Sequence, residues 1–254
     1  LQNDQLHLVY QPVVSAYNQQ IVAVEALVRW QHPVHGAIAP SSLIPIAEDS
    51  GMIVDLGRWV LQTACRALRS WEGAPGLNSL AVAVNVSPSQ LTHRGFVGDF
   101  DRILSESGVQ PSRLLLEVTE NVVALGDDMI ELLSDLRSRG VRLALDDFGQ
   151  GQTSLRYLRD LPLDVLKIDK AFVDAIDASP TDEAIVHAIV DLAHKLGIRV
   201  IAEGVEREDQ LRILRGFSTD FLQGYLIHRP KGEAEMAELL GVSRPGRPTA
   251  VGVG

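Results

Sequence analysis

The sequence predicts an α/β protein, a (β/α)8 TIM-like barrel whose first strand runs antiparallel to the others. Eight short runs rich in Val and Leu alternate with helical segments, and runs of this kind form strands that are buried on both faces. Seven of the eight end in a carboxylate, an amide or a lysine, which is expected where the strands of a barrel converge on one rim. The length of 254 residues suits a single barrel, which commonly takes about 250 residues.

The first two runs, residues 6–14 and 21–30, are separated by only six residues. A parallel crossover needs a dozen or more residues, so these runs must form an antiparallel hairpin. Two helices are predicted next, one after residue 41 and one over 54–71. We therefore expect the first strand to run antiparallel to the second, which is a departure from a regular parallel barrel.

Strand and helix alternate from residue 80 onward, which predicts a mostly parallel sheet with right-handed crossovers. The predicted strands are 80–86, 113–118, 141–146, 163–168, 198–203 and 219–222. The predicted helices are 96–107, 127–139, a short one around 155–158, 181–196, 207–215 and 232–240. Residues 1–241 are thus assigned to the barrel, and the Pro/Gly-rich residues 242–254 to a disordered tail or linker.

The composition limits the partners and the compartment. Lys+Arg 23 against Asp+Glu 33 gives a net charge of −10, which argues against a surface that binds duplex nucleic acid but permits a small anion held through cations. Cys65 is the only cysteine, so a buried thiol in a reducing cytoplasm is expected. No apolar stretch approaches the ~20 residues of a membrane span. Because the chain starts at Leu1 rather than Met, we expect a domain that is fused to upstream regulatory domains in a longer protein. We expect this domain to be cytoplasmic, including where the longer protein is attached to a membrane.

The polar residues at the strand ends predict a metal centre. Five carboxylates would share the rim: Glu25, Glu117, Asp146, Asp147 and Glu203. Two such charges about 4 Å apart repel by roughly 4 kcal/mol at an effective dielectric of ~20, so cations must neutralise the cluster. With Asn85 the donors are all oxygen, which favours Mg²⁺ or Mn²⁺ over zinc or copper. Two such ions are a standard device for attacking a phosphodiester.

Lys167 lies in an apolar strand, where an ammonium is costly unless it meets carboxylates or a bound anion. It could orient a nucleophile or accept its proton; the alternative is that it only neutralises a nearby acid such as Asp169.

No histidine metal site is predicted. His187 and His194 should be solvated, opposite an apolar stripe at residues 185, 189, 192 and 196. The loop 148–154 has two glycines but no lysine, so it is not a P-loop.

Seven motifs occur in the order EALVRW, NVS, EVTE, DDFG, KID, EGVE and QGY. In these motifs the chain resembles the EAL-domain phosphodiesterases, which hydrolyse the bacterial second messenger cyclic di-GMP to linear pGpG. The resemblance runs from Tyr10 to Pro230, nearly the whole chain. It implies an enzyme that uses two Mg²⁺ or Mn²⁺ ions.

The resemblance also implies a role for each matching residue. One metal would be bound by Glu25, Asn85, Glu117 and Asp146, with Glu203 drawn into the same network, and the second would be held by Asp147. Lys167 and Asp169 would position the attacking water, and Gln223 would lie near the scissile phosphate. Substrate contacts would come from Gln11 to a guanine, from Arg29 to a phosphate and from Leu27. Support for the site and its loop would come from Glu120, Glu206, Gly149 and Gly151.

The chain departs from the family at one loop, because it reads DDFGQGQTS where DDFGTGYSS is usual. Gln150 and Gln152 stand where a small residue and an aromatic are expected, in a loop that couples a homodimer contact to the second metal. Two alternatives to an active phosphodiesterase stay open: a weak or silent cyclic di-GMP receptor, and a Schiff-base aldolase that uses Lys167.

Overall fold

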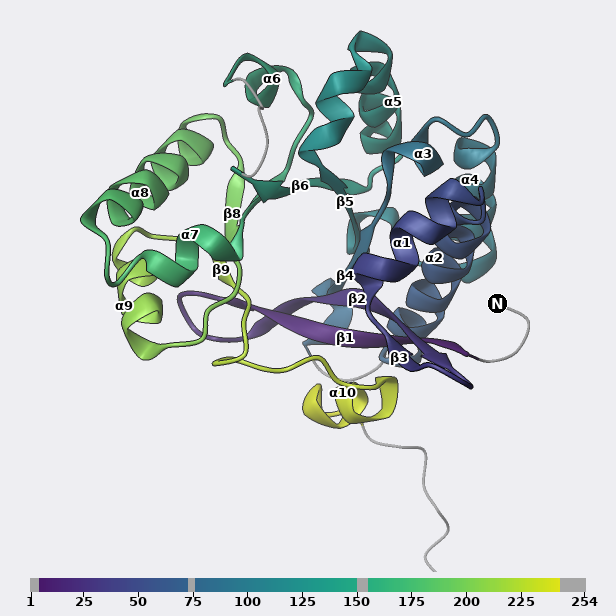
Figure 1. Cartoon of the computed structure of the whole chain (residues 1–254), viewed down its shortest axis with the longest axis horizontal. Helices are drawn as coiled ribbons and strands as arrows, with labels where there is room; N and C mark the ends of the chain where they lie inside the picture. The colour runs from purple at the N-terminus through teal and green to yellow at the C-terminus, as the bar shows by residue number, and fades with distance from the viewer. Residues whose placement is uncertain (1–4, 73–75, 150–154, 243–254) are drawn as a thin grey trace, which may run out of the picture.

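The computed structural model describes residues 5–72, 76–149 and 155–242. Eight strands close into a ring, and the helices pack around the outside of it (Figure 1). The strands of the ring are β1 (Leu6–Ser15), β2 (Ile21–His32), β4 (Ala81–Asn85), β5 (Leu114–Thr119), β6 (Arg142–Phe148), β7 (Val165–Ile168), β8 (Arg199–Ala202) and β9 (Phe221–Leu222). The predicted barrel is confirmed.

The order around the ring is β1-β9-β8-β7-β6-β5-β4-β2, and the pairing of β1 with β2 closes it. Neighbours from β2 to β9 run parallel, whereas β1 is antiparallel to both β2 and β9. The short strand β3 (Gly36–Ile38) pairs only with the extension of β2, outside the ring. The six-residue connector thus has the predicted effect, an antiparallel first strand in an otherwise parallel barrel.

The helices lie between the strands in sequence and cover the outer face of the ring (Figure 1). They are α1 (Pro40–Asp49), α2 (Ile53–Ser70), α3 (Pro88–Leu91), α4 (Phe96–Ser107), α5 (Asp127–Ser138), α6 (Leu155–Asp160), α7 (Lys170–Ala175), α8 (Pro180–Lys195), α9 (Glu208–Gly216) and α10 (Glu233–Leu239). Three 3-10 turns accompany them: Leu77–Ser79, Pro111–Arg113 and Glu120–Leu125. Within the described part of the chain, no helix is both long and apolar enough to cross a bilayer.

The barrel wall is buried on both faces, and its inner face positions the site. An inner layer of small and medium side chains fills the ring: Val13, Ala23, Ala81, Ala83, Leu115, Ala144, Val165 and Ile201. Side chains alternate along a strand, so the residue two positions after each member of this layer points into the same interior. Ala144, for example, is followed on the inner face by Asp146. The strand pattern therefore stacks polar side chains directly above an apolar plug.

The apolar stripe predicted for α8 is correct only in its middle. Ile189 and Leu192 pack against the core, whereas Ile185 and Leu196 are 38% and 37% exposed. The fully buried residues of this helix are Val186, Val190 and Ala193, so the buried face is turned from the predicted one.

Both histidines of α8 are exposed, as predicted, and each also contacts a protein group. The His187 ring stacks on Phe217 with centroids 4.5 Å apart, and His194 Nε2 lies 2.8 Å from Asp220 Oδ2. Both histidines thus contact protein groups other than the rim carboxylates.

Cys65 is fully buried in α2, as predicted, and burial raises the pKa of its thiol to about 11. β3, α3 and α7 were not predicted from the sequence, because each is too short to show a periodic pattern. Of the predicted tail, residues 243–254 lie outside the described part of the chain.

Candidate functional site

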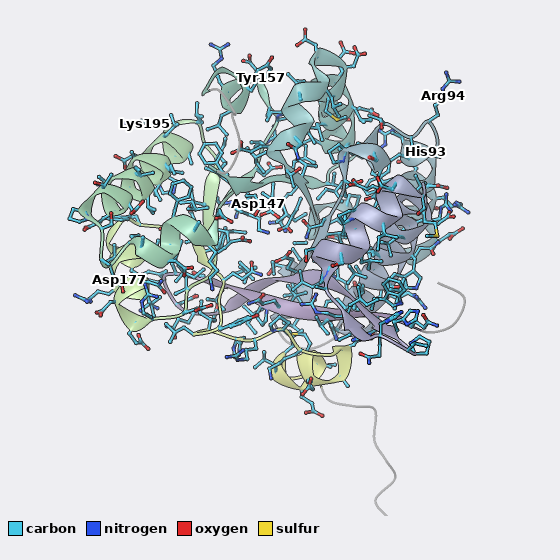
Figure 2. The ribbon with its side chains drawn as sticks, viewed as in Figure 1. His93, Arg94, Asp147, Tyr157, Asp177 and Lys195 are labelled. Atoms are coloured by element: carbon cyan, nitrogen blue, oxygen red, sulfur yellow. The ribbon has the colours of Figure 1, made fainter. Side chains whose placement is uncertain are left out.

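The acidic residues converge at the carboxyl ends of the parallel strands. Glu117 lies on β5, Asp146 on β6, and Glu203 directly follows β8. Glu25 differs from the prediction, because it lies inside β2 rather than at its end; β2 continues past the rim to pair with β3. Figure 2 shows Asp147 at the central opening of the ring, whereas Arg94 and Lys195 lie at the outer edge of the molecule.

The Lys167 ammonium lies at the centre of this cluster. Its Nζ is 2.7 Å from Glu203 Oε1, 3.0 Å from Glu117 Oε1 and 3.0 Å from Asp146 Oδ1. Glu25 Oε2 is farther away, at 3.8 Å. The lysine side chain is only 1% exposed. One ammonium cannot neutralise four carboxylates, so the remaining negative charge must be offset by bound protons or cations.

The pKa values follow from burial and from mutual repulsion of the acids. Burial is the largest cause that raises the pKa of Glu203 to about 8 and that of Asp147 to about 6, and Asp146 adds to both. Burial also raises the pKa of Glu117 well above its usual range, against the attraction of Lys167. For Lys167, burial lowers the pKa, but the surrounding carboxylates outweigh burial and hold it well above its usual range. The lysine is therefore a cation, and several of the acids compete for protons.

Two amides orient the Glu25 carboxylate. Asn85 Nδ2 donates to Glu25 Oε1 at 2.9 Å, and Gln223 Nε2 donates to Glu25 Oε2 at 2.7 Å. In addition, Glu117 Oε2 is buried and has no hydrogen-bond partner among the described residues. A buried carboxylate oxygen without a partner is costly. An oxygen-seeking cation fits this donor set, because it would satisfy that oxygen and reduce the excess negative charge.

A possible metal position overlaps this cluster and adds Asp147 to two of its acids. One oxygen from each of Asp146, Asp147 and Glu203 lies within 4.8 Å of the others, a spacing that can hold a metal ion. Asp147 has a left-handed backbone with φ 55°, which turns its side chain out of the strand alternation, and its carboxyl is hydrogen-bonded to Asp169. Asp169 in turn caps α7 by accepting from Ala171 N at 2.7 Å.

The loop after Asp147 is attached to the barrel by Glu120. Glu120 Oε1 accepts from the backbone N–H of Gly149 at 2.7 Å. Gly149 has φ 106°, and a Cβ placed there would lie 2.2 Å from Phe172 Cε2, so this position requires glycine. Gly151, with Gln150 and Gln152, lies outside the described residues, as does the corresponding part of the predicted dimer contact.

The residues predicted to bind substrate lie in two adjoining hollows. Gln11 and Leu27 line the mouth, a hollow of about 360 Å³ that is also lined by Gln223 and by the acids Glu25, Asp146, Asp147 and Glu203. Arg29 lines the neighbouring hollow of about 350 Å³, which shares Leu27 with the mouth. The Arg29 Nη1 donates to the carbonyl of Val28 at 2.8 Å, and Gln11 Nε2 donates to that of His228 at 3.2 Å.

Two further residues of the mouth were not singled out from the sequence. Lys170 forms an ion pair with Glu206 at the edge of the mouth, and Tyr225 lines the same hollow with half of its surface exposed. Arg229 lies over the Tyr225 ring, 4.4 Å from its centroid. Lys170 directly follows the KID motif and Tyr225 is the last residue of QGY, so their place in the motif pattern was the available signal.

Known proteins share this arrangement. The profile of the EAL domain matches residues 1–230. The chain is 45% identical over 241 residues to the cyclic di-GMP phosphodiesterase NbdA of Pseudomonas aeruginosa, a match that covers 94% of this chain and 31% of the relative. It is 43% identical over 231 residues to the bifunctional diguanylate cyclase/cyclic di-GMP phosphodiesterase MucR of the same organism, covering 91% and 34%. The chain thus spans about a third of the length of these relatives.

Solved structures agree with these relatives. The PaMucR phosphodiesterase in complex with c-di-GMP superimposes with a TM-score of 0.87 at 42% identity, covering 91% of this chain and 94% of that one. The EAL enzyme Bd1971 in its cAMP-bound form gives a TM-score of 0.90 at 34% identity, covering 94% of this chain and 67% of that one. The barrel, the rim of acids and these matches lead to one conclusion: the chain belongs to the EAL domain family.

Proposed function

We propose that this domain hydrolyses cyclic di-GMP to linear pGpG with the help of two Mg²⁺ or Mn²⁺ ions. The observation that carries the proposal is the cage of carboxylates around Lys167, with a buried Glu117 oxygen that lacks a partner. An all-oxygen donor set favours Mg²⁺ or Mn²⁺. The similarity to relatives that are named cyclic di-GMP phosphodiesterases supports the choice of substrate.

The metal-binding residues would be Glu25, Asn85, Glu117, Asp146, Asp147 and Glu203. When bound, the ions would supply Lewis acidity and the positive charge that the phosphodiester and its attacking water require. The donors must lose protons to bind cations, and the raised pKa values of Glu203 and Asp147 mean that binding releases protons.

The other residues of the mouth would act on the substrate and the water. Lys167, an ammonium held by three acids, would orient the attacking water, and Asp169, hydrogen-bonded to Asp147, would help to position it and accept its proton. Gln223 bonds to Glu25 and would keep that carboxylate aligned beside the scissile phosphate. Arg29 and Gln11 would bind a phosphate and a guanine from opposite sides of Leu27.

The aldolase alternative conflicts with the charge state of Lys167. A Schiff base forms from a neutral amine. Here the carboxylates hold the pKa of Lys167 well above its usual range, and the side chain is buried among them. The geometry favours an ammonium that stays protonated.

The test is an incubation of the domain with cyclic di-GMP and Mg²⁺, with the products separated by chromatography. We expect linear pGpG as the product, no turnover in EDTA, and recovery with excess Mg²⁺ or Mn²⁺. Ca²⁺ should permit substrate binding without turnover, because its larger and looser ligand shell misplaces the nucleophile. Binding of cyclic di-GMP with no product under any metal would show a receptor domain instead. Full activity in chelator would overturn the metal mechanism.

We also propose that the domain works in the cytoplasm as part of a longer signalling protein and as a homodimer through the barrel and the loop after Asp147. The share of the relatives' length that the chain covers supports the longer protein. The single buried cysteine suits a reducing compartment. Sedimentation of the domain with and without Mg²⁺ tests the dimer, which a monomer under both conditions would contradict.

A further inference from the structure

A cluster of arginines lies at the end of the barrel opposite the mouth. Arg142 begins β6, Arg199 begins β8, and Arg215 lies in the last turn of α9. Arg142 and Arg199 each precede a member of the inner layer, Ala144 and Ile201, by two positions. Strand alternation therefore places both on the inner face of the barrel base. This concentration of positive charge stands out in a protein of net charge −10.

These three guanidinium groups have no ion pair among the described residues. Arg199 lies over the Phe221 ring, 5.2 Å from its centroid, and Arg215 Nε donates to the carbonyl of Ala16 at 2.9 Å. The buried Nε of Arg142 has no hydrogen-bond partner within the described part of the chain. Burial, followed by repulsion from Arg199, lowers the pKa of Arg142. The base of the barrel thus has positive charge that the protein leaves unpaired.

The two acids near this cluster are already bonded to other groups. Asp164 pairs with Arg137 at 2.9 Å, and its second oxygen accepts from a backbone N–H of β6 at 3.0 Å. Asp220 Oδ2 accepts from the backbone N–H of Val200 at 2.8 Å and lies 2.8 Å from the ring of His194. Asp164 attracts Arg142 electrostatically, but within the described part of the chain neither acid forms an ion pair with any of the three arginines.

A hollow of about 650 Å³ opens beside Arg199 and Arg215, and we call it the basal hollow. Its other polar lining side chains include the hydroxyls of Ser15, Ser218 and Thr219. The carboxylate of Asp220 also lines it, with Oδ2 bonded to the Val200 N–H and to His194. Thr219 is 3% exposed, and its hydroxyl has no partner among the described residues. Tyr17, at the turn between β1 and β2, lines the hollow with its side chain 95% exposed.

We propose that the basal hollow binds a phosphate-bearing small molecule of about mononucleotide size. The planar guanidinium groups match phosphate oxygens, and unpaired arginines gain most from an anion. The hydroxyls supply further donors, and the open Tyr17 ring offers a surface on which a planar base can stack. The volume lies within the range of small-molecule sites. The chemistry is opposite to that of the mouth, which is acidic and needs cations before it can hold an anion.

The experiment records amide shifts of the intact chain by NMR during titration with inorganic pyrophosphate or with guanosine monophosphate. Physiological salt screens non-specific attraction, and EDTA keeps the acidic mouth free of cations. We expect saturable shifts around residues 15–18, 199 and 215–221, with tighter binding of the nucleotide because it adds a ring. Pyrophosphate that binds as tightly as the nucleotide would restrict the site to its phosphate chemistry and contradict the stacking on Tyr17.

Two variants and two controls locate the site. Arg199→Gln and Arg215→Gln should each weaken binding by about tenfold or more, since each removes a charged donor. Arg94→Gln, at the outer edge of the molecule, and Arg29→Gln, in the hollow next to the mouth, should bind like the unaltered protein. The amide spectrum reports whether each variant is folded. No saturable shift up to about 10 mM, or equal weakening by Arg94→Gln, would overturn the proposal.

Discussion

Lys167 is the residue of the mouth whose charge is most costly to bury, because its side chain is only 1% exposed. Among the described residues, the groups that offset this cost are the surrounding carboxylates. We predict that Lys167→Gln lowers kcat by about 10²- to 10⁴-fold, the usual contribution of a positioned acid–base group. In EDTA the same change should destabilise the fold by about 3–5 kcal/mol, since it removes one partner of a buried ionic cluster.

The matched control is Lys195→Gln, which removes the same charge at the outer edge of the molecule (Figure 2). Rates in Mg²⁺ and urea unfolding in EDTA would be compared for both variants. If Lys167→Gln turns over at the rate of the control, the assignment of this lysine to the reaction is wrong.

Arg29 lies in a different hollow from the acids, so its loss should separate binding from chemistry. We predict that Arg29→Ala raises KM by about tenfold or more with a smaller change in kcat, because it removes a charged hydrogen bond to a phosphate. Arg94→Ala serves as the control for lost surface charge. An equal rise in KM for both variants would show non-specific attraction of the substrate.

Most residues of the rim were predictable from the sequence, for a physical reason. Glu117, Asp146 and Lys167 interrupt apolar strands, and a charge in such a place is costly unless it has a function or a partner. The roles within the rim were less accessible. Nothing in the spacing shows that Lys167 contacts three acids at once, because those acids come from three different strands.

Gly149 links two elements, β6 and the loop that follows it. We predict that Gly149→Ala destabilises the protein by about 1–3 kcal/mol, because alanine strains at φ 106° and its Cβ would collide with Phe172. The displaced N–H would also lose its bond to Glu120, so hydrolysis should fall as well.

Gly98 provides the contrast within α4, because a Cβ there meets no atom within 4 Å and the backbone is helical. Gly98→Ala should stabilise the protein by about 0.5–1 kcal/mol without an effect on activity. Urea unfolding of both variants tests the pair. Similar stabilities would contradict the packing described for Gly149.

Long elements were predictable to within a few residues, since their apolar periodicity repeats over several turns or strand positions. The short ones were not. The four-residue α3 is held by a capping box between Ser87 and Gln90, and α7 begins at the Asp169 cap, which also bonds to Asp147. Such helices depend on local caps and tertiary contacts rather than on a pattern of apolar residues.

The whole molecule should respond to pH through its mouth. The folded-state pKa of Glu203 is raised to about 8 and that of Asp147 to about 6, above the values of about 4 for these side chains in unfolded chains. The folded state therefore binds more protons than the unfolded state between pH 4 and 8. Its stability should be fully present below about pH 4 for these groups and decrease as pH rises toward 8.

Urea unfolding in EDTA across this pH range measures the effect, and Glu203→Gln should reduce the slope because the amide does not titrate. Saturating Mg²⁺ should flatten it further, since the cation replaces the protons. Stability in EDTA that increases from pH 5 to 8 would contradict the raised pKa values.

At the scale of the whole molecule, the barrel was predictable from the alternation of strands and helices. Its antiparallel first strand was predictable because a six-residue connector leaves only a hairpin for the first two strands. The basal hollow was not. Arg142, Arg199 and Arg215 are spread over more than seventy residues, and each is an ordinary surface residue by sequence. Only the closure of the ring brings them together and shows that none of them has an ion pair among the described residues.

The reversed direction of β1 also decides where the chain enters the barrel. Leu6 pairs with Trp30, on the part of β2 that extends past the mouth, whereas the turn at Tyr17 lies at the base. In a fully parallel barrel, the first strand would begin at the base, on the side away from the chemistry. Here a segment that precedes Leu6 would begin beside the mouth. Movement of such a segment could cover or expose the rim directly, without a conformational change in the barrel.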